Sequence, residues 1–339
     1  MSDRVVIVDI RRGPNFVDRV DLSQMGGRAG RSHNGTMREA FVDVVVSEED
    51  SSLASDMLSS LDNHPVDSVL DSAESIAFHI LPDIYNGVIQ NMDDARDWMS
   101  KTFFCFMGGD PDIVEDAVEL LVEDEALKIG RDKQFFVTLQ GSISATLYFA
   151  ASDVMAWRMN FEEIFDRGVE DTDVGVAWAL SSVPGQIRHI GSSDSKFAVE
   201  EFRDQASAYG LKVMDGTAGV GACWWWLMGG PSVKGMKAEA YSLRKDFGRI
   251  KLALDGIDKA CGWEQKDFLR CLDVRIMRRV PAEIAPLFQV EGISKEVAFE
   301  LYNIGIGSLE ELNEKKFLVE ASDNERLIRA VNRFFGSVS

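Results

Sequence analysis

The residues best suited to chemistry in this sequence lie in one short segment near its start, Gln24-Met25-Gly26-Gly27-Arg28-Ala29-Gly30-Arg31. Arg28 and Arg31 carry planar guanidinium groups that stay charged and match the geometry of phosphate oxygens. Gly27 and Gly30 let the backbone approach a ligand closely because they lack a side chain. The pattern favours phosphate chemistry. The alternative is a surface loop rich in glycine and arginine.

A second candidate is a basic segment within a strongly acidic chain. The 339 residues carry 36 lysines and arginines against 56 acids, for a formal net charge of −20. Between residues 233 and 279 the balance reverses to twelve bases and seven acids, a net charge of +5. The overall acidity argues against coating nucleic acid with the whole surface. A local basic track stays compatible with nucleic-acid binding, and the alternative is an ordinary solvated helix face. The bases proposed for binding are Lys245, Arg249, Arg275, Arg278 and Arg279.

A third candidate is the tail of the chain. The sequence predicts short helices over 282–287 and 295–304, joined by a hairpin around Gly292. Backbone N–H groups at such a hairpin, and at the start of the next helix, bind a phosphate without regard to base sequence. Ser294 is expected to cap that helix and Gly305 to end it. Residues 308–311 form a capping box for a further helix. The proposed phosphate-binding residues are Gly292, Ser294 and Lys295, although Glu291 opposes an anion there.

The elements that must position these residues change character along the chain. Residues 4–10 and 40–46 are β-branched and apolar, which predicts buried parallel strands at the edge of an α/β domain. Helical spacing follows over 66–89, 93–106 and 112–123, then a strand over 135–139 that would complete a terminal hairpin. Residues 150–280 are mostly helical. The helix expected over 112–123 contains Glu115, Asp116, Glu119 and Glu123 and no base, so packing is a better role for it than reading a DNA groove.

Several classes of protein are excluded by the sequence. No apolar run approaches the length of a membrane helix, and the start lacks the features of a signal peptide. The four cysteines form no CxxC pair and the four histidines are scattered, so neither a disulfide framework nor a metal site is expected. We expect an intracellular protein without a membrane partner. No Gly-x-x-x-x-Gly-Lys-Ser/Thr motif and no Mg²⁺-binding acidic box occurs, so the chain alone is not expected to hydrolyse ATP.

The segment from Gln24 to Arg31 resembles motif VI of superfamily 2 helicases. The order of parts after it is similar to that of the archaeal Hel308-type DNA helicases and their Ski2-like relatives, including the helicase portion of DNA polymerase theta. Residues 4–10 match the strand before motif VI, and 95–106 and 117–128 look like winged-helix segments. The stretch 272–312 is similar to the last two domains of the family.

The resemblance implies a mainly α chain with four parts. These are a C-terminal fragment of the second RecA-like α/β domain over 1–50, a winged helix over 51–149, a helical ratchet domain over 150–280 and a helix-hairpin-helix domain over 281–339. It also implies that Arg28 and Arg31 act as arginine fingers on a nucleotide γ-phosphate, and that Gln24 senses the nucleotide or the attacking water. The first RecA-like domain and most of the second are expected to lie upstream.

The implied function is that of the C-terminal part of an ATP-dependent 3′–5′ helicase or translocase in DNA repair and recombination. Its substrate would be single-stranded or forked DNA, and its partner an N-terminal RecA-like motor part. ATP with Mg²⁺ would be its cofactor only together with that motor part. The implied location is cytoplasmic, in association with the nucleoid.

The sequence departs from the family in two places. The resemblance puts a DNA-lining helix near 245–260 with Arg249 facing the DNA, but the tryptophan expected two turns later falls near Gly256. Trp263 and the cluster Trp224-Trp225-Trp226 are alternative stacking platforms, with at least one of the cluster expected in the core. In the tail, Ser294 replaces a second glycine.

Two other functions remain open at this point. The first alternative to a DNA helicase part is a stand-alone DNA-binding or adaptor module without ATPase activity. The second is part of an RNA helicase. The helix-hairpin-helix tail favours DNA over RNA.

Overall fold

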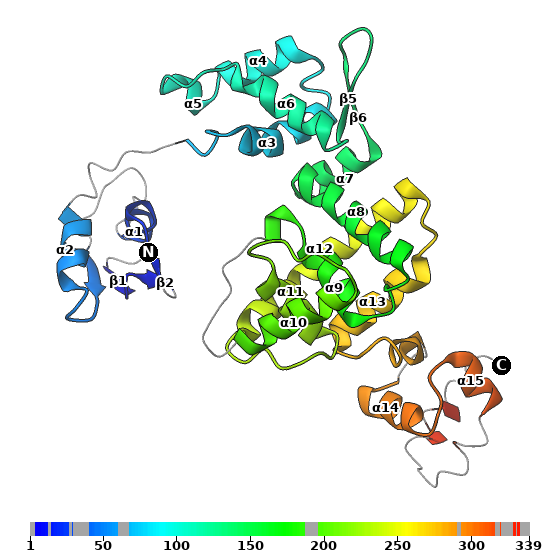
Figure 1. Cartoon of the computed structure of the whole chain (residues 1–339). Helices are drawn as coiled ribbons and strands as arrows, with labels where there is room; N and C mark the ends of the chain where they lie inside the picture. Colours follow the sequence, from blue (N-terminus) through cyan, green and yellow to red (C-terminus); the bar gives the residue numbers. More distant parts are fainter. Residues whose placement is uncertain are drawn as a thin grey trace. The chain divides into compact units, whose positions relative to one another are not determined.

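The computed structural model describes residues 4–12, 15–26, 29, 41–59, 68–186, 196–289 and 293–315, and the single positions 319, 328, 329, 331 and 332. In these ranges the chain is mainly helical, as predicted. It divides into two units, residues 1–69 and 70–339 (Figure 1). None of the helices in the described ranges has the length and hydrophobicity needed to cross a membrane.

The first unit contains a two-stranded parallel sheet, which confirms the predicted strand direction. The pairing runs in register from Arg4 opposite Phe41 to Val8 opposite Val45. A small core gathers six side chains, Ile7, Ile10, Val17, Leu22, Ala54 and Met57. The elements are β1 (Arg4–Val8), β2 (Arg11–Arg12), β3 (Asn15–Phe16), α1 (Arg19–Gly26), β4 (Phe41–Val45) and α2 (Ser51–Ser59).

The predicted burial of these strands is wrong for most of their residues. Val8 is 77% exposed and Phe41 67% exposed, and only Ile7 is buried in β1. The cause is that the described part of this unit has two strands in the parallel sheet and a core on one side only. Apolar strand residues therefore remain on the surface.

Helix α2 also lies elsewhere than the sequence analysis placed it. Residues 51–59 were assigned to the winged helix, but Ala54 and Met57 pack in the same core as Ile10 and Leu22. Arg11 pairs with Asp50 just before the helix, at 2.6 Å. The helix therefore belongs to the first unit.

The second unit begins with three helices, a short helical turn and a hairpin, in the predicted order. Ile76 and Ile80 of the first helix pack with Val114 and Leu121 of the last. Side-chain caps from Ser72, Asn91 and Thr102 start three of these helices. The elements are α3 (Ala73–Tyr85), α4 (Met92–Ser100), α5 (Phe103–Phe106), α6 (Ile113–Glu123), β5 (Leu127–Ile129) and β6 (Phe135–Val137).

A helix that the sequence analysis did not predict follows the hairpin at once. The predicted strand over 135–139 ends at Val137, because the side chain of Thr138 caps helix α7 (Leu139–Leu147) by accepting a hydrogen bond from Gly141 N–H. Ala145 packs into the core of the preceding helices, and Ile143 packs into the core of the helices that follow. Helix α7 thus joins two cores.

The largest core lies in the helical part that follows. Helices α9 and α11 are buried almost all round, as expected for central helices, and contact each other (Figure 1). Helix α12 has 25 residues, longer than the predicted 245–260, and ends at Gly262 with φ +68°. The elements are α8 (Ala151–Arg167), α9 (Asp173–Ser181), η2 (Pro184–Gln186), α10 (Lys196–Ala208), α11 (Ala218–Leu227), α12 (Lys237–Cys261) and α13 (Lys266–Arg278).

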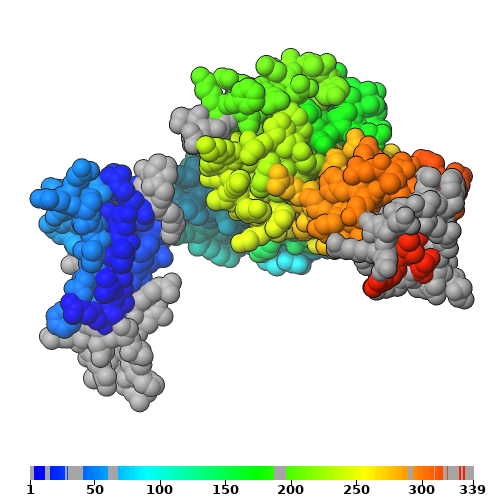
Figure 2. Space-filling model, turned by 90° about the horizontal axis from the view of Figure 1, so that it is seen from below, coloured from blue at the N-terminus to red at the C-terminus, as the bar shows by residue number. Residues whose placement is uncertain are grey.

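The tail forms a small core of its own around Leu287, Leu301 and Leu312. The predicted helix over 282–287 is instead a run of turns and a 3-10 helix, because bonds such as Leu287 N–H to Ile284 O span three residues. The described elements are η4 (Ala285–Gln289), α14 (Lys295–Asn303) and α15 (Leu309–Glu314). Figure 2 shows the orange surface of this segment continuous with that of α13, in agreement with the contacts between α13 and η4.

Candidate nucleic-acid interface

One side of α12 carries all six bases of this helix. The opposite side carries the buried residues that pack into the core, among them Leu243, Phe247, Ile250 and Leu254. At about 3.6 residues per turn, the six bases of this helix fall within about half of its circumference, away from those buried positions. One acid, Asp255, lies among them and pairs with Lys251 at 2.7 Å. The six bases are Lys237, Arg244, Lys245, Arg249, Lys251 and Lys259.

Arg249 lies on this basic face and is exposed. Its guanidinium carbon lies 4.4 Å from the centre of the Phe149 ring, and its Nη1 donates to the carbonyl oxygen of Tyr148 at 3.5 Å. These residues form the connection between α7 and α8, and Tyr148 adopts a left-handed backbone with φ +56°. The connection therefore orients the Arg249 side chain. No carboxylate in the described ranges forms an ion pair with it.

Lys245 and Arg278 are exposed as the sequence analysis expected. Neither forms an ion pair with another residue that the structure describes. Lys266 and Arg270 of α13 add two further bases where α12 and α13 line a shared pocket with Lys251 and Lys259. Three aspartates line the same pocket, so its charge is nearly balanced.

The position of Arg275 corrects its assignment to the predicted DNA-binding residues. Its side chain is 2% exposed, and its Nη2 lies 2.6 Å from Oδ1 of Asp173 at the start of α9. Burial raises the pKa of Asp173, and the positive charge of Arg275 partly offsets that effect. The guanidinium faces the interior, so this residue joins α13 to α9 and does not reach a ligand at the surface.

Arg279 and Lys295 have partners that the sequence did not reveal. The guanidinium of Arg279 lies 4.0 Å from the Trp226 ring centre, and its Nε donates to Trp226 O at 3.2 Å. The ammonium of Lys295 donates to the carbonyl oxygens of Arg279 at 2.6 Å and Arg278 at 3.2 Å. These hydrogen bonds satisfy carbonyl oxygens at the end of α13. Burial is the main cause that lowers the pKa of the Lys295 ammonium. Lys295 thus has a structural role in these contacts, and its phosphate contact stays a prediction.

The capping predictions for the tail are confirmed. The Ser294 side chain accepts a hydrogen bond from Val297 N–H, so its oxygen is used by the helix. Ser308 accepts from Glu311 N–H, the carboxylate of Glu311 accepts from Gly307 N–H, and Gly305 has φ +83°. Gly292 of the proposed hairpin lies outside the described residues.

The proposed arginine-finger segment is described only in part. Gln24 lies in α1 with an exposed side chain. Gly27, Arg28, Gly30 and Arg31 lie outside the described residues, so their roles stay predictions.

The alternative stacking platforms are mostly buried. Trp224 is 0% exposed and Trp226 2% exposed, which confirms that the cluster contributes to the core. Trp263 packs in an aromatic group with Phe161, Phe165 and Phe268, and its Nε1 donates to Glu162 at 3.3 Å. Trp224 and Trp226 are therefore buried, and Trp263 is half-buried among phenylalanine rings.

One basic surface was missed by the sequence analysis. The hairpin β5–β6 exposes Lys128, Arg131 and Lys133 next to Phe136, whose side chain is 54% exposed. Three bases within residues 128–133, followed by Phe135 and Phe136, are the signal that points to it. The acidic residues of the neighbouring helix α6 mask this signal when the charge of residues 112–137 is considered as a whole.

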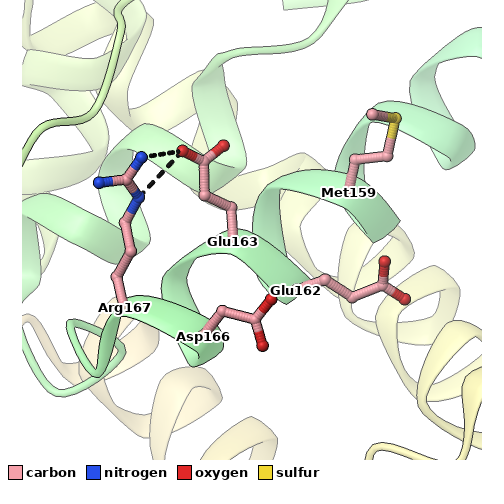
Figure 3. A pocket seen from close by; sticks show the side chains of 5 residues that line it. All are labelled: Met159, Glu162, Glu163, Asp166 and Arg167. Atoms are coloured by element: carbon pink, nitrogen blue, oxygen red, sulfur yellow. Dashed lines mark hydrogen bonds and ion pairs between the residues drawn. The ribbon is translucent and has the colours of Figure 1, made fainter.

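A second pocket in the described structure does not suit a polyanion. It is lined by five residues of α8, and Arg167 pairs with Glu163 at 2.8 Å (Figure 3). The other two carboxylates, from Glu162 and Asp166, would repel phosphate. No group of three or more metal-binding side chains occurs among the described residues.

No protein-family model matches the chain. The ATP-dependent DNA helicase Hel308 of Pyrococcus horikoshii is 23% identical over 337 residues, which cover 91% of this chain and 46% of that protein. The ATP-dependent DNA helicase Hel308 of Thermococcus kodakarensis is 27% identical over 153 residues, covering 43% of this chain and 13% of that protein. The chain thus spans less than half the length of these curated relatives. The weak similarity supports a relationship to these archaeal helicases.

Proposed function

We propose that this chain is the C-terminal part of an ATP-dependent 3′–5′ DNA helicase or translocase of DNA repair and recombination. In this proposal α12 lines a path for single-stranded DNA, and Arg249 and Lys245 contact its phosphates. Arg28 and Arg31 serve as arginine fingers for ATP and Mg²⁺ held by an N-terminal RecA-like motor part. The observation that carries the proposal is the basic face of α12, in a chain that aligns over most of its length with a DNA helicase.

The arrangement of the cores is compatible with this proposal. The first unit has one core and the second unit has three. We propose that these four cores correspond to a RecA-like fragment, a winged helix, a ratchet domain and a helix-hairpin-helix domain. The apolar surface of β1 and β4, including Val8 and Phe41, is suited to further strands or helices of an α/β domain. That surface is where the remainder of the motor would pack.

The first experiment measures single-stranded DNA binding against salt concentration. Each phosphate contact contributes about 0.7 to the slope of log K against log salt for single strands. We expect a clear slope for the natural chain, and one smaller by about 0.7 for Arg249→Ala. Glu163→Ala, on the acidic face of α8, is the control and leaves the slope unchanged. A flat salt dependence contradicts phosphate binding.

The second experiment tests the motor. The chain is mixed with the matching N-terminal helicase part, and DNA-stimulated ATP hydrolysis is measured for the natural chain and for Arg28→Ala. We expect stimulation with the natural chain and a loss of about 10³-fold or more with the variant, as for other arginine fingers. Absence of both association and activity contradicts the helicase assignment and leaves the stand-alone binding module.

A stand-alone DNA-binding or adaptor module is the second candidate. It predicts salt-sensitive DNA binding that neither ATP nor Arg28→Ala changes. Competition between matched DNA and RNA oligonucleotides tests the third candidate, an RNA helicase part. Preference for RNA would support it.

A further inference from the structure

The basic face of α12 carries an exposed aromatic ring next to its cations. The side chain of Tyr241 is 44% exposed, and the guanidinium carbon of Arg244 lies 5.0 Å from the centre of its ring. Lys245 follows one turn later on the same face, and one turn further Gly248 leaves the surface open, with nothing within 4 Å of the position a Cβ would take. An aromatic ring, cations and an open surface therefore lie in one row along the helix.

The ring of Tyr241 is held in place from below. Trp226 is 2% exposed and contacts it edge to face, with 5.7 Å between the ring centres and 77° between their planes. Arg279 covers Trp226, with its guanidinium carbon 4.0 Å from that ring centre. Because its neighbours already fix its orientation, the tyrosine loses little freedom when a ligand stacks on it.

At the other exposed aromatic rings with a nearby cation, the cation already has a partner. Arg11 lies 4.1 Å from the Phe16 ring centre but is paired with Asp50, and Lys295 near Phe299 is held by two carbonyl oxygens. Arg244 forms no ion pair with another residue in the described ranges. Its charge is available to a phosphate while Tyr241 contacts the base.

We propose that Tyr241 is a nucleobase-stacking residue of the α12 track, with Arg244 and Lys245 holding the adjoining phosphates. The inference rests on the proposed function, because it assumes that single-stranded nucleic acid follows this helix. Sequence-independent binding of single strands combines a basic groove with aromatic rings, because every base has a face that stacks. Gly248 leaves space for the next nucleotide.

The test compares stacking with phosphate binding in the full chain. Binding of a thymidine oligonucleotide is measured by fluorescence anisotropy across a salt series for Tyr241→Ala, Tyr241→Leu and Tyr241→Phe. We expect the alanine and leucine variants to bind about 5- to 150-fold more weakly, and the phenylalanine variant to bind like the natural chain. The salt slope stays unchanged in all three, because no phosphate contact is lost. Tyr85→Ala, an equally exposed tyrosine in α3, is the matched control.

A second ligand shows whether the base itself is contacted. An oligonucleotide of the same length without bases should bind the natural chain more weakly, and most of that difference should vanish in Tyr241→Leu. If Tyr241→Ala and Tyr241→Leu bind like Tyr85→Ala while the natural chain keeps its salt slope, the stacking role is overturned and the proposed function stands. If the natural chain binds neither oligonucleotide, both are overturned. Circular dichroism confirms that each variant is folded.

Discussion

Gly256 of α12 lies directly against Ile143 of α7. A Cβ atom at Gly256 would meet Cδ1 of Ile143 at 2.8 Å and Cγ1 at 2.9 Å. Glycine therefore permits the close approach of two helices, and Ile143 fills the space that a larger side chain would need. A tryptophan at this position would collide with Ile143.

A large side chain at Gly256 should destabilise the protein. We expect Gly256→Leu to lower the free energy of unfolding by about 1–3 kcal/mol, because the added carbons overpack the contact with Ile143. Gly248→Leu makes the same change in the same helix, where nothing lies within 4 Å of the new Cβ. It should be neutral or stabilising by about 0.5–1 kcal/mol. Urea denaturation compares the two, and equal effects would argue against close packing at Gly256.

Arg275 and Arg278 should respond differently to removal. Arg275→Ala leaves Asp173, whose side chain is 21% exposed, without its partner, so we expect a loss in unfolding free energy of at most about 3–5 kcal/mol. Arg275→Met with Asp173→Leu removes both charges and should recover much of that loss. Arg278→Ala changes an exposed side chain and should alter stability by less than about 0.5 kcal/mol. A large stability loss in Arg278→Ala alone would contradict these assignments.

Lys295 should stabilise the junction between α13 and α14. Lys295→Met keeps the aliphatic stem and removes the hydrogen bonds to the carbonyl oxygens of Arg278 and Arg279. We expect a loss of about 1–2 kcal/mol in thermal or urea denaturation, as for hydrogen bonds to charged groups. Lys259→Met, at an exposed lysine, is the control for loss of one charge. A reduced salt slope for DNA binding in Lys295→Met would support the phosphate contact predicted from the sequence.

Asp153 should make stability depend on pH. Its carboxylate is 8% exposed and accepts a hydrogen bond from Gly185 N–H at 2.6 Å. Burial raises its pKa despite that bond. Because the folded state binds this proton more tightly than the unfolded state, the group's stabilising effect is full below the ordinary carboxyl pKa of about 4 and falls as pH rises through the raised value.

The variant Asp153→Asn cannot lose a proton there and keeps an oxygen for Gly185. We expect its unfolding free energy, relative to that of the natural chain, to increase as pH rises from about 4 towards neutrality. Urea denaturation at a series of pH values measures this difference. Parallel curves for the two proteins would show that Asp153 does not ionise with a raised pKa.

Local structure could be predicted well from the sequence wherever the cause is local. The caps at Ser294 and Ser308, the left-handed Gly305 and the mainly helical character all follow from side-chain chemistry and spacing within a few residues. The two strands at residues 4–8 and 41–45 were also predictable, because both segments are β-branched and apolar. Helix α7 was missed because its cap, Thr138, directly follows residues typical of a strand.

Only the tertiary structure decided which basic residues lie at the surface and which contact other parts of the chain. Arg275, Arg278 and Arg279 are neighbours in the sequence, but one is buried on Asp173, one is exposed, and one covers Trp226. The sequence by itself determined that positive charge is concentrated near residues 233–279 and that a motif of glycines and arginines precedes it. The direction of each side chain depends on partners tens of residues away, because burial and ion pairing are set by how the helices pack.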